Sequence, residues 1–512
     1  MLEHYQQRFQ HLLVDEFQDT NTIQYAWLRV LAGSGSAMPL VAVGDDDQSI
    51  YGWRGAKIEN IQQFTSDFPA TRTVRLEQNY RSTATILKAA NAVISHNIGR
   101  LGKELWTAGD EGEPISLFAG FNETDEARFI AEQVETWHER GRDRKGMAVL
   151  YRSNAQSRVL EEAFMQRAIP YRIYGGQRFY DRVEVKNVLA YLRLMLGREN
   201  DPAIERVINT PPRGVGARTV EVLREQARAM EGSLWVAMLH VEENQLLPAR
   251  ALKALAGFRE LVDDLSTMVE EMDLPQLVDH VIGAVELIEY HKKEKGERGQ
   301  ARVENLQELV SAARSFHSDD DDSGPLQLFL DGAALDAGAG QAGEDEDSVQ
   351  MMTLHSAKGL EYPIVFLSGV EENLFPHRMS LEEPGRLEEE RRLCYVGLTR
   401  AMEKLYISYA ETRRLHGSDS YNAPSRFIRE IPADLLEEVR VGTSFSLPTS
   451  FSAREDLQLD GLALGQRVLH QVFGEGVILN FEGGGSNGRV QVNFDSEGSK
   501  WLVLQYANLQ QM

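Results

Sequence analysis

Two short apolar runs of the chain each end in a loop of acidic residues. Leu12-Leu13-Val14 leads directly into Asp15-Glu16, and the run from Leu40 to Val43 leads into Gly44 and three aspartates. Short apolar runs that end in polar loops are typical of strands in a parallel α/β sheet, because helices cover such strands on both faces. The sequence therefore predicts an α/β fold with chemistry at one edge of the sheet.

The first run has the Walker-B pattern of nucleotide hydrolases. In that pattern Asp15 would hold Mg²⁺, and Glu16 would accept a proton from an attacking water. The partner pattern, Gly-x4-Gly-Lys-Ser/Thr, is expected upstream, yet it is not found in the 512 residues. The nearest stretch, Gly102-Lys103-Glu104, has Glu where Ser or Thr is needed and Asn97 where the first Gly is needed. We therefore expect the later part of a motor that begins before residue 1.

Bulk composition limits the class of protein. A chain of 512 residues with 42% hydrophobic and 26% charged residues is expected to form several soluble domains. No apolar run approaches the roughly 20 residues of a membrane span, and no signal peptide opens the chain. The single cysteine, Cys394, excludes an internal disulfide and fits a reducing cytoplasm.

The net charge of −24 opposes a nucleic-acid partner. Charge acts over only about 8 Å at physiological salt, however. The acid is partly segregated into three runs, at 319–322, 344–347 and 388–390. Net charge therefore lowers the expectation of DNA binding without excluding it.

The spacing of apolar residues divides the chain into regions of expected strands and regions of expected helices. Strands are expected at 115–117, 147–150, 349–353 and 364–367. Helices are expected at 84–95, and then in a block at 185–196, 220–230, 252–268 and 303–316. A helical block inserted into an α/β domain is the simplest account. After residue 432 a linker leads into a small β unit from residue 465.

The loop after the second strand combines polar and aromatic residues. Gln48 is suited to sensing a γ-phosphate, whereas Tyr51, Trp53 and Arg54 offer aromatic faces beside a cation, which suits stacking on unpaired bases. The preceding aspartates could indicate a metal loop, but the oxygen spacing is not the usual one. For Trp53 taken alone, core packing would be the better interpretation.

Three later segments supply further candidates. Gln78 to Ser82 contains Tyr80, suited to adenine stacking or to ordinary packing, and Arg81, suited to a transferring phosphoryl group. Thr353 to Glu361 supplies small polar groups for phosphate contact. Arg391 to Ala401 contains a second phosphate-directed cation, Arg400.

Together these segments resemble the superfamily 1 helicases of the UvrD/Rep/PcrA type. The carrying motifs are, in order, Val-Asp-Glu-Phe-Gln-Asp-Thr-Asn, Gly-Asp-Asp-Asp-Gln-Ser-Ile-Tyr-Gly-Trp-Arg-Gly, Gln-Asn-Tyr-Arg-Ser, His-Ser-Ala-Lys-Gly-Leu-Glu and Tyr-Val-Gly-Leu-Thr-Arg-Ala. Five motifs in the family's order make the resemblance specific, and it extends over nearly the whole chain.

The resemblance implies roles for individual residues. It implies ATP and Mg²⁺ as cofactors, with Mg²⁺ at Asp15 and a water-activating Glu16. The implied γ-phosphate contacts are Gln48, Arg81 and Arg400, with Tyr80 on adenine and Glu361 on ribose. The implied contacts to single-stranded DNA are Trp53, Tyr51, Arg54, Thr353 and His355.

The resemblance also implies an architecture of RecA-like lobes with an inserted helical domain and a Tudor-like β-barrel. Residues 1–77 would be the remainder of the first lobe, 78–174 and 348–435 the second lobe, and 175–347 the mobile inserted domain. Residues 436–464 would be a linker and 465–512 the Tudor-like domain, which would dock a protein such as RNA polymerase or serve as a structural cap.

Two further segments admit two interpretations each. The turn containing Arg213, Gly214 and Gly216 opens a helix, so its amides would grip a duplex phosphate or simply join two helices. Residues 405–418 resemble the family's strand-separating hairpin, with His416 at the tip where an aromatic phenol is usual.

These observations predict an ATP-dependent 3′-to-5′ DNA helicase acting on single-stranded and forked duplex DNA in repair and replication. It would be cytoplasmic, a monomer or dimer, and would work with mismatch or excision repair proteins. Without the phosphate loop, the chain alone is expected not to turn over ATP. The alternatives are a non-enzymatic module that binds forked DNA or proteins and, less favoured because no acidic and Lys set suits two-metal cleavage, a helicase-nuclease.

Overall fold

The computed structural model describes residues 1–33, 38–294, 297–316, 324–338, 342–343, 345–383, 385–415, 418–439, 467–470, 474–482, 489–494, 498–503 and 509–511. The chain divides into two compact units, Met1–Arg440 and Val441–Met512. Within the described ranges, no helix is both long and apolar enough to cross a membrane.

The N-terminal segment contains the predicted pair of strands. Strands β1 (Leu12–Val14) and β2 (Leu40–Ala42) are parallel, and each is followed by a short polar turn. Helices α2 and α3 cover one face of the pair around a core of Phe17, Tyr25, Leu28 and Phe64. The helices of this segment are α1 (Leu2–Arg8), α2 (Thr22–Ala32) and α3 (Glu59–Asp67), with single turns η1 (Phe17–Asp19), η2 (Asp46–Gln48) and η3 (Gly52–Arg54).

The other face of this small sheet is exposed. Leu13 and Val41 are paired across the two strands and are 78% and 53% exposed. The sequence predicts strands covered on both faces, whereas the described part of the chain covers only one. Because Leu13 and Val41 are apolar, the sequences of these strands resemble those of strands buried on both faces.

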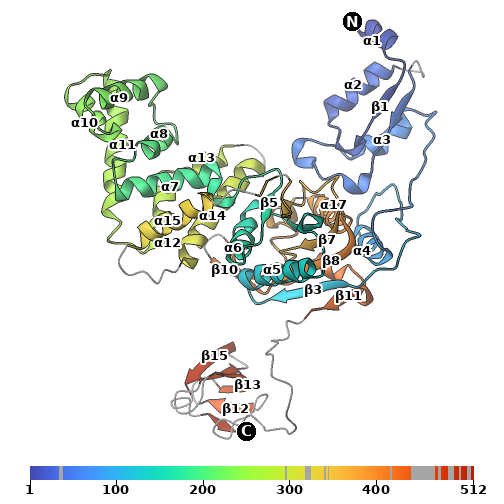
Figure 1. Cartoon of the computed structure of the whole chain (residues 1–512). Helices are drawn as coiled ribbons and strands as arrows, with labels where there is room; N and C mark the ends of the chain where they lie inside the picture. Colours follow the sequence, from blue (N-terminus) through green and yellow to red (C-terminus); the bar gives the residue numbers. More distant parts are fainter. Residues whose placement is uncertain are drawn as a thin grey trace. The chain divides into compact units, whose positions relative to one another are not determined.

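A seven-stranded sheet in the order β11-β3-β8-β7-β4-β6-β5 forms the centre of the first unit (Figure 1). All its neighbouring strands are parallel. Parallel neighbours need long crossovers, and here helices supply them. The strands are β3 (Ile115–Gly120), β4 (Met147–Tyr151), β5 (Tyr171–Ile173), β6 (Val349–Thr353), β7 (Tyr362–Leu367), β8 (Ala401–Ala410) and β11 (Leu436–Glu438). The mixed α/β class is confirmed.

Helices cover both faces of this sheet, as the period of two in a strand requires. Ala148 and Leu150 of β4 pack with one set of helices, and Val149 and Tyr151 pack with the other. Helices α4 (Ala84–Ile94) and α17 (Arg386–Leu398) lie on the first face; α5 (Glu123–Glu139) and α6 (Ser157–Gln166) lie on the second.

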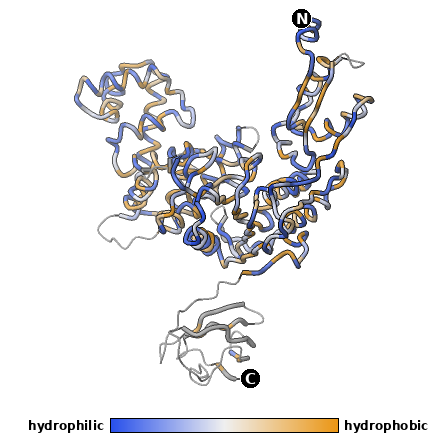
Figure 2. The backbone as a smooth tube through the Cα atoms, turned by 45° about the vertical axis from the view of Figure 1, so that its right-hand side comes forward, coloured by the Kyte–Doolittle hydropathy of each residue, from blue (hydrophilic) through white to orange (hydrophobic). Residues whose placement is uncertain are grey.

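Between β5 and β6 the described residues form helices around their own apolar core. Hydrophilic and hydrophobic stretches alternate along this block (green to yellow in Figure 1), as expected for helices with one buried face (Figure 2). The helices are α7 (Val183–Leu196), α8 (Asp201–Val207), α9 (Ala217–Ala229), α10 (Leu234–Glu243), α11 (Ala249–Thr267), α12 (Leu274–Ala284), α13 (Leu287–Lys292), α14 (Glu297–Ser315) and α15 (Pro325–Gly338).

The structure corrects the position of the predicted hairpin. Residues 401–410 form β8, which lies inside the parallel sheet between β3 and β7. The antiparallel hairpin is instead β9 (Thr412–Leu415) with β10 (Ser418–Tyr421). The apolar stretch from Leu405 is buried on both faces, so it belongs to the sheet core rather than to an exposed arm.

The predicted linker also begins too early. Leu436–Glu438 form β11, which pairs in parallel with β3 at the edge of the sheet. A strand of three residues at an edge carries too little periodicity to be recognised from sequence. Residues 440–466 lie outside the described residues. The remaining smaller elements are α16 (Arg378–Glu382), α18 (Arg426–Arg429), η4 (Arg144–Gly146), η5 (Asn154–Gln156), η6 (Phe179–Asp181) and η7 (Ala433–Leu435).

The second unit is a five-stranded antiparallel sheet in the order β15-β14-β13-β12-β16. Val468, Val490 and Val492 are its described buried side chains. Its strands are β12 (Arg467–His470), β13 (Gly474–Glu482), β14 (Arg489–Phe494), β15 (Gly498–Val503) and β16 (Gln510–Gln511). The separate small β unit predicted from residue 465 is confirmed.

Candidate nucleotide and DNA site

The Walker-B carboxylates lie in a sharp turn at the carboxyl end of β1. Both Asp15 and Glu16 are exposed, and Glu16 has a φ of 48°, a conformation that non-glycine residues rarely adopt. Such backbone geometry is often found at functional sites. An exposed carboxylate at the end of a parallel strand suits a divalent cation, so Asp15 fits its predicted role.

Lys358, in the loop after β6 of the large sheet, contacts this turn. Its ammonium donates to Asp19 Oδ2 at 2.6 Å and to the Gln48 carbonyl at 3.0 Å, and it lies 3.0 Å from Glu16 Oε2. Burial raises the pKa of Asp19, and the Lys358 contact opposes that rise. Residues far apart in sequence thus meet at the predicted water-activating carboxylate. Lys358 was not among the predicted site residues.

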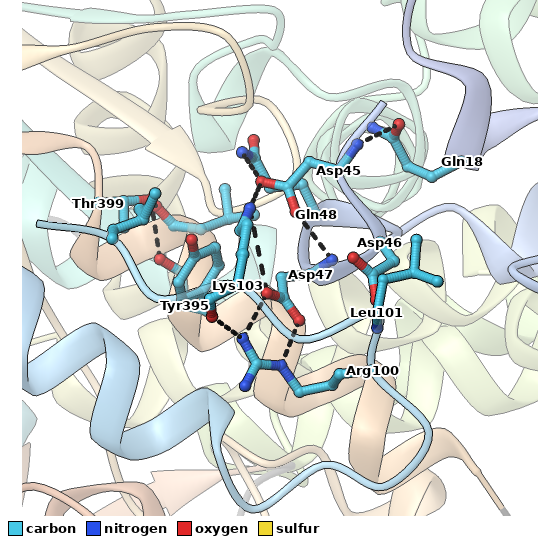
Figure 3. A network of polar contacts seen from close by, with 12 residues as sticks. Gln18, Asp45, Asp46, Asp47, Gln48, Arg100, Leu101, Lys103, Tyr395 and Thr399 are labelled. Atoms are coloured by element: carbon cyan, nitrogen blue, oxygen red, sulfur yellow. Dashed lines mark hydrogen bonds and ion pairs between the residues drawn. The ribbon is translucent and has the colours of Figure 1, made fainter. Parts of the chain in front are cut away.

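Gln18 connects Glu16 to the polar loop after β2. Its side-chain amide donates to Glu16 Oε2 at 2.6 Å, and its carbonyl accepts from the backbone N–H of Asp45 at 2.9 Å (Figure 3). A Cβ at Gly44 would lie 2.6 Å from Gln18 Oε1. A side chain at residue 44 would therefore displace the Gln18 amide from its hydrogen bond with Asp45.

Gln48, the predicted γ-phosphate sensor, is held within its own loop. Its amide donates to Asp45 Oδ2 at 2.7 Å, and Asp45 Oδ1 accepts from the backbone N–H of Asp47 at 3.0 Å. This bond uses one of the two N–H donors of the Gln48 amide and fixes the direction of the side chain.

The three aspartates 45–47 form the acidic cluster in the described ranges whose oxygens lie within 4.8 Å of one another. Arg100, the backbone N–H of Leu101 and Lys103 already contact these carboxylates. Arg100 and Lys103 therefore offset the charge of two of the three carboxylates, and the third accepts a backbone hydrogen bond.

Two predicted nucleotide contacts are joined to each other. Arg81 Nε forms an ion pair with Glu361 Oε2, although the sequence interpretation gives them to different parts of the nucleotide. The ring of Tyr80 is 85% exposed, and its hydroxyl donates to Gln78 at 2.8 Å. An exposed ring beside a paired arginine leaves Tyr80 open to stacking.

Arg400 is buried, unlike an ordinary surface arginine. Its guanidinium donates to the carbonyls of Val396 and Leu360, both at 3.0 Å, and to Thr399 Oγ1 at 3.1 Å. Burial lowers the pKa of Arg400 to about 10, and the neighbouring positive charge of Arg81 adds to this effect. The two arginines are therefore close enough for their charges to interact.

Four of the predicted DNA contacts form one aromatic cluster, which we call the platform: Tyr51, Trp53, Arg54 and His355. The Trp53 and His355 rings meet edge to face with centroids 6.3 Å apart, and the Arg54 guanidinium lies 4.5 Å from the Trp53 ring. Tyr51 donates its hydroxyl to the His355 carbonyl at 3.2 Å. The loop after β2 and the loop after β6 thus build one surface suited to stacked bases.

His355 is neutral in this cluster. Burial lowers its pKa to about 3, and the nearby charges of Arg152 and Arg54 contribute. Thr353 ends β6 beside it, with its Oγ1 3.0 Å from Ser356 Oγ. A neutral imidazole offers a ring and a hydrogen bond rather than a charge.

In the turn predicted to bind duplex DNA, the side chain of Arg213 forms hydrogen bonds within the protein. The Arg213 guanidinium donates to the carbonyls of Val207 and Pro211 at 3.1 and 3.2 Å. Gly214 has a φ of +88°, and Gly216 is the N-cap of α9. Arg213 therefore holds the turn, whereas Gly214 and Gly216 stay exposed.

His416 lies outside the described residues. The base of its hairpin is described, and it is anchored by Arg413, which donates to Glu371 at 2.8 Å and also pairs with Glu126. All three side chains are buried.

The structure thus brings together an acidic pair at the end of a parallel strand, two neighbouring arginines and an aromatic cluster with a cation. This combination suits an ATP-driven enzyme that acts on nucleic acid. Comparison with known proteins makes the class specific. Residues 74–412 match the UvrD-like helicase C-terminal domain, residues 1–69 the UvrD/REP helicase N-terminal domain, and residues 464–511 the PcrA/UvrD tudor domain.

Two curated relatives cover the whole chain. The chain is 55% identical to DNA helicase II of Escherichia coli (strain K12) over 515 residues, which is 100% of this chain and 71% of that protein. It is 40% identical to the ATP-dependent DNA helicase PcrA of Bacillus subtilis (strain 168) over 533 residues, or 100% of this chain and 72% of that protein. The chain belongs to the UvrD-like DNA helicases, which are ATP-dependent enzymes.

Sequence reasoning missed Gln18, Lys358 and the pair Arg100 and Lys103. Gln18 and Lys358 lie inside motifs that were recognised, so their motifs were the available signal. Lys103 was considered only within Gly102-Lys103-Glu104, a stretch that does not match the phosphate-loop pattern.

Proposed function

We propose that the chain carries the DNA-tracking and phosphate-sensing part of a helicase that unwinds forked duplex DNA in the 3′-to-5′ direction with ATP. One observation carries this proposal: Lys358 contacts both Glu16 and the Gln48 carbonyl, and its ammonium lies 5.5 Å from the Tyr51 ring. A change at the carboxylate is therefore transmitted directly to the platform that would hold the DNA.

The chemical roles follow from side-chain chemistry. Asp15 would hold Mg²⁺, and MgATP, when bound, would supply the phosphoryl group that is transferred to water. Glu16 would accept the proton of the attacking water. Gln48, Arg81 and Arg400 would contact the γ-phosphate, with the arginines stabilising its developing charge.

The remaining predicted contacts orient the ligands. Tyr80 would stack on adenine, and Glu361 would accept from the ribose once its pair with Arg81 opens. Trp53, Tyr51, Arg54 and His355 would stack single-stranded bases, with Thr353 on the adjacent backbone. Gly214 and Gly216 of the inserted domain would approach duplex phosphates, and Arg213 would shape their turn. His416 would meet the last base pair at the hairpin tip.

The 512-residue polypeptide has no Gly-x4-Gly-Lys-Ser/Thr sequence. Since phosphate loops of this type grip the β- and γ-phosphates, we propose that this polypeptide binds DNA without appreciable ATP turnover.

Single-strand binding and ATPase assays test these proposals together. We expect the polypeptide to bind oligo(dT) with an affinity that falls by roughly 5- to 150-fold in Trp53→Ala, since stacking one base contributes about 1–3 kcal/mol. An exposed tryptophan remote from the platform, Trp106→Ala, serves as the matched control. DNA-stimulated ATPase that Glu16→Gln abolishes would overturn the proposed lack of turnover, and equal affinities of the two variants would overturn the platform.

For the domains we propose the boundaries set out from the sequence, with the start of the linker moved past β11. The second unit would dock a protein partner such as RNA polymerase, since it has its own sheet and core. Retention of RNA polymerase or repair proteins that is unchanged after deletion of residues 461–512 would contradict docking by this unit.

A further inference from the structure

A segment of four residues contacts each of the three consecutive aspartates in the loop after β2. Arg100 donates from Nε and Nη2 to the two carboxylate oxygens of Asp47, both at 2.7 Å. The backbone N–H of Leu101 donates to Asp46 Oδ2 at 2.7 Å, and Lys103 forms an ion pair with Asp45 Oδ2. We call this segment, Arg100 to Lys103, the clamp (Figure 3).

The clamp has a conformation suited to this one-to-one pairing. Gly102 has a φ of +72°, in the region that favours glycine. This turn lets residues on both sides of Gly102 reach the same loop. The exposed fractions of the Arg100 and Lys103 side chains are 17% and 18%, and that of Asp47 is 2%, so the contacts are screened little by solvent.

The aspartate loop is continuous with the DNA platform. Asp45 accepts from Gln48, and Tyr51, Trp53 and Arg54 follow within the next turn, η3. The backbone of Asp45 is held on its other side by Gln18, the partner of Glu16. Asp45 is therefore the point at which the carboxylate side, the phosphate sensor and the clamp meet.

We propose that Lys103 is a positioning residue for single-stranded DNA binding, acting through Asp45 on the loop that carries Gln48, Tyr51 and Trp53. Arg100 supports it by neutralising buried Asp47. Lys103 itself does not contact DNA: its ammonium is directed at Asp45, 4.0 Å from Asp47 and 5.5 Å from the Tyr395 ring. The inference rests on the proposed DNA platform and adds a residue outside every recognised motif.

The affinity for oligo(dT) and its dependence on salt distinguish a Lys103 that positions the loop from a Lys103 that contacts DNA directly. We expect Lys103→Met to weaken oligo(dT) binding about tenfold, the scale of coupling between connected residues, with an unchanged slope of log affinity against log salt. Lys103→Arg, which keeps the charge, should restore most of the affinity. The control is Lys88→Met, which removes a lysine of α4 that pairs with exposed Glu111.

A double-mutant cycle identifies the route. If Lys103 acts through Asp45, then Asp45→Asn with Lys103→Met should be no weaker than Asp45→Asn alone. A salt slope reduced by about 0.7 in Lys103→Met would show a lost phosphate contact and overturn the proposal. An affinity equal to that of Lys88→Met would also overturn it.

Hydrogen exchange tests the same idea without DNA. In the free protein, Lys103→Met should speed amide exchange in the peptide covering residues 44–55 and leave helix α7 unchanged. If the wild-type chain failed to bind oligo(dT), the proposed platform would fail, yet this exchange result would still support or refute the clamp. Unchanged exchange at 44–55 would overturn it, and faster exchange throughout the first unit would show general destabilisation instead and also count against it.

Discussion

Replacing Lys358 by Met should loosen the N-terminal segment from the large sheet. The Lys358 side chain is 7% exposed and that of Asp19 is 19% exposed, whereas that of Glu16 is 54% exposed. We therefore assign about 1.5–3 kcal/mol to the charged hydrogen bond with Asp19 and about 1 kcal/mol to the bond with the Gln48 carbonyl. The exposed Glu16 pair contributes little. The expected loss of about 3 kcal/mol is roughly a 150-fold change in a local opening equilibrium.

The loss should depend on pH in a defined direction. Burial already raises the pKa of Asp19, and Lys358 holds it down, so removing Lys358 raises that pKa further. A carboxyl group whose pKa is raised in the folded state destabilises that state as pH rises from the unfolded pKa of about 3.8 through the folded pKa. The deficit of Lys358→Met should therefore be larger at pH 8 than at pH 4.

Hydrogen-exchange mass spectrometry of residues 12–21 measures this opening directly. Lys57→Met is the matched control, because Lys57 is an exposed lysine of the same N-terminal segment. Equal protection of the two variants at pH 8 would refute the reasoning. A deficit that grew as the pH fell would refute the assignment to Asp19.

Two further outcomes follow from buried charges. Arg413→Met should lower the free energy of unfolding by about 3–5 kcal/mol, because it leaves Glu126 and Glu371 buried without their cation. In guanidinium unfolding, adding Glu126→Gln and Glu371→Gln to this variant should recover most of the loss. No recovery would contradict the argument from charge. Oligo(dT) affinity should show no titration of His355 between pH 5 and 8, since burial lowers the pKa of that residue to about 3. A midpoint near pH 6.5 that disappears in His355→Asn would show a charged histidine instead.

Many of the helices and strands could be predicted from the spacing of apolar residues within a single segment. Helices α7, α9, α11 and α14 follow apolar residues at three-and-four spacing, and β4 and β7 follow apolar runs, because both patterns record which face of an element is buried. The platform was also predicted, since Tyr51, Trp53 and Arg54 are neighbours in one loop. His355 joined them only through its motif.

The hairpin and the start of the linker were placed incorrectly for a common reason. Whether the stretch from Leu405 enters the sheet, or Leu436 pairs with β3, depends on which strand lies beside it. That choice is made by the crossover topology rather than by the residues of the strand.

Sequence alone established which chemical groups this protein has: an acidic pair after a strand, arginines in two separate motifs, a loop with aromatic residues beside a cation, and no Gly-x4-Gly-Lys-Ser/Thr sequence within the 512 residues. The tertiary structure decided which groups meet. It joined Lys358 to Glu16, Arg81 to Glu361, and the clamp to three aspartates. Ion pairs between distant segments leave no periodic trace along the chain, because they depend on how the sheet brings those segments together.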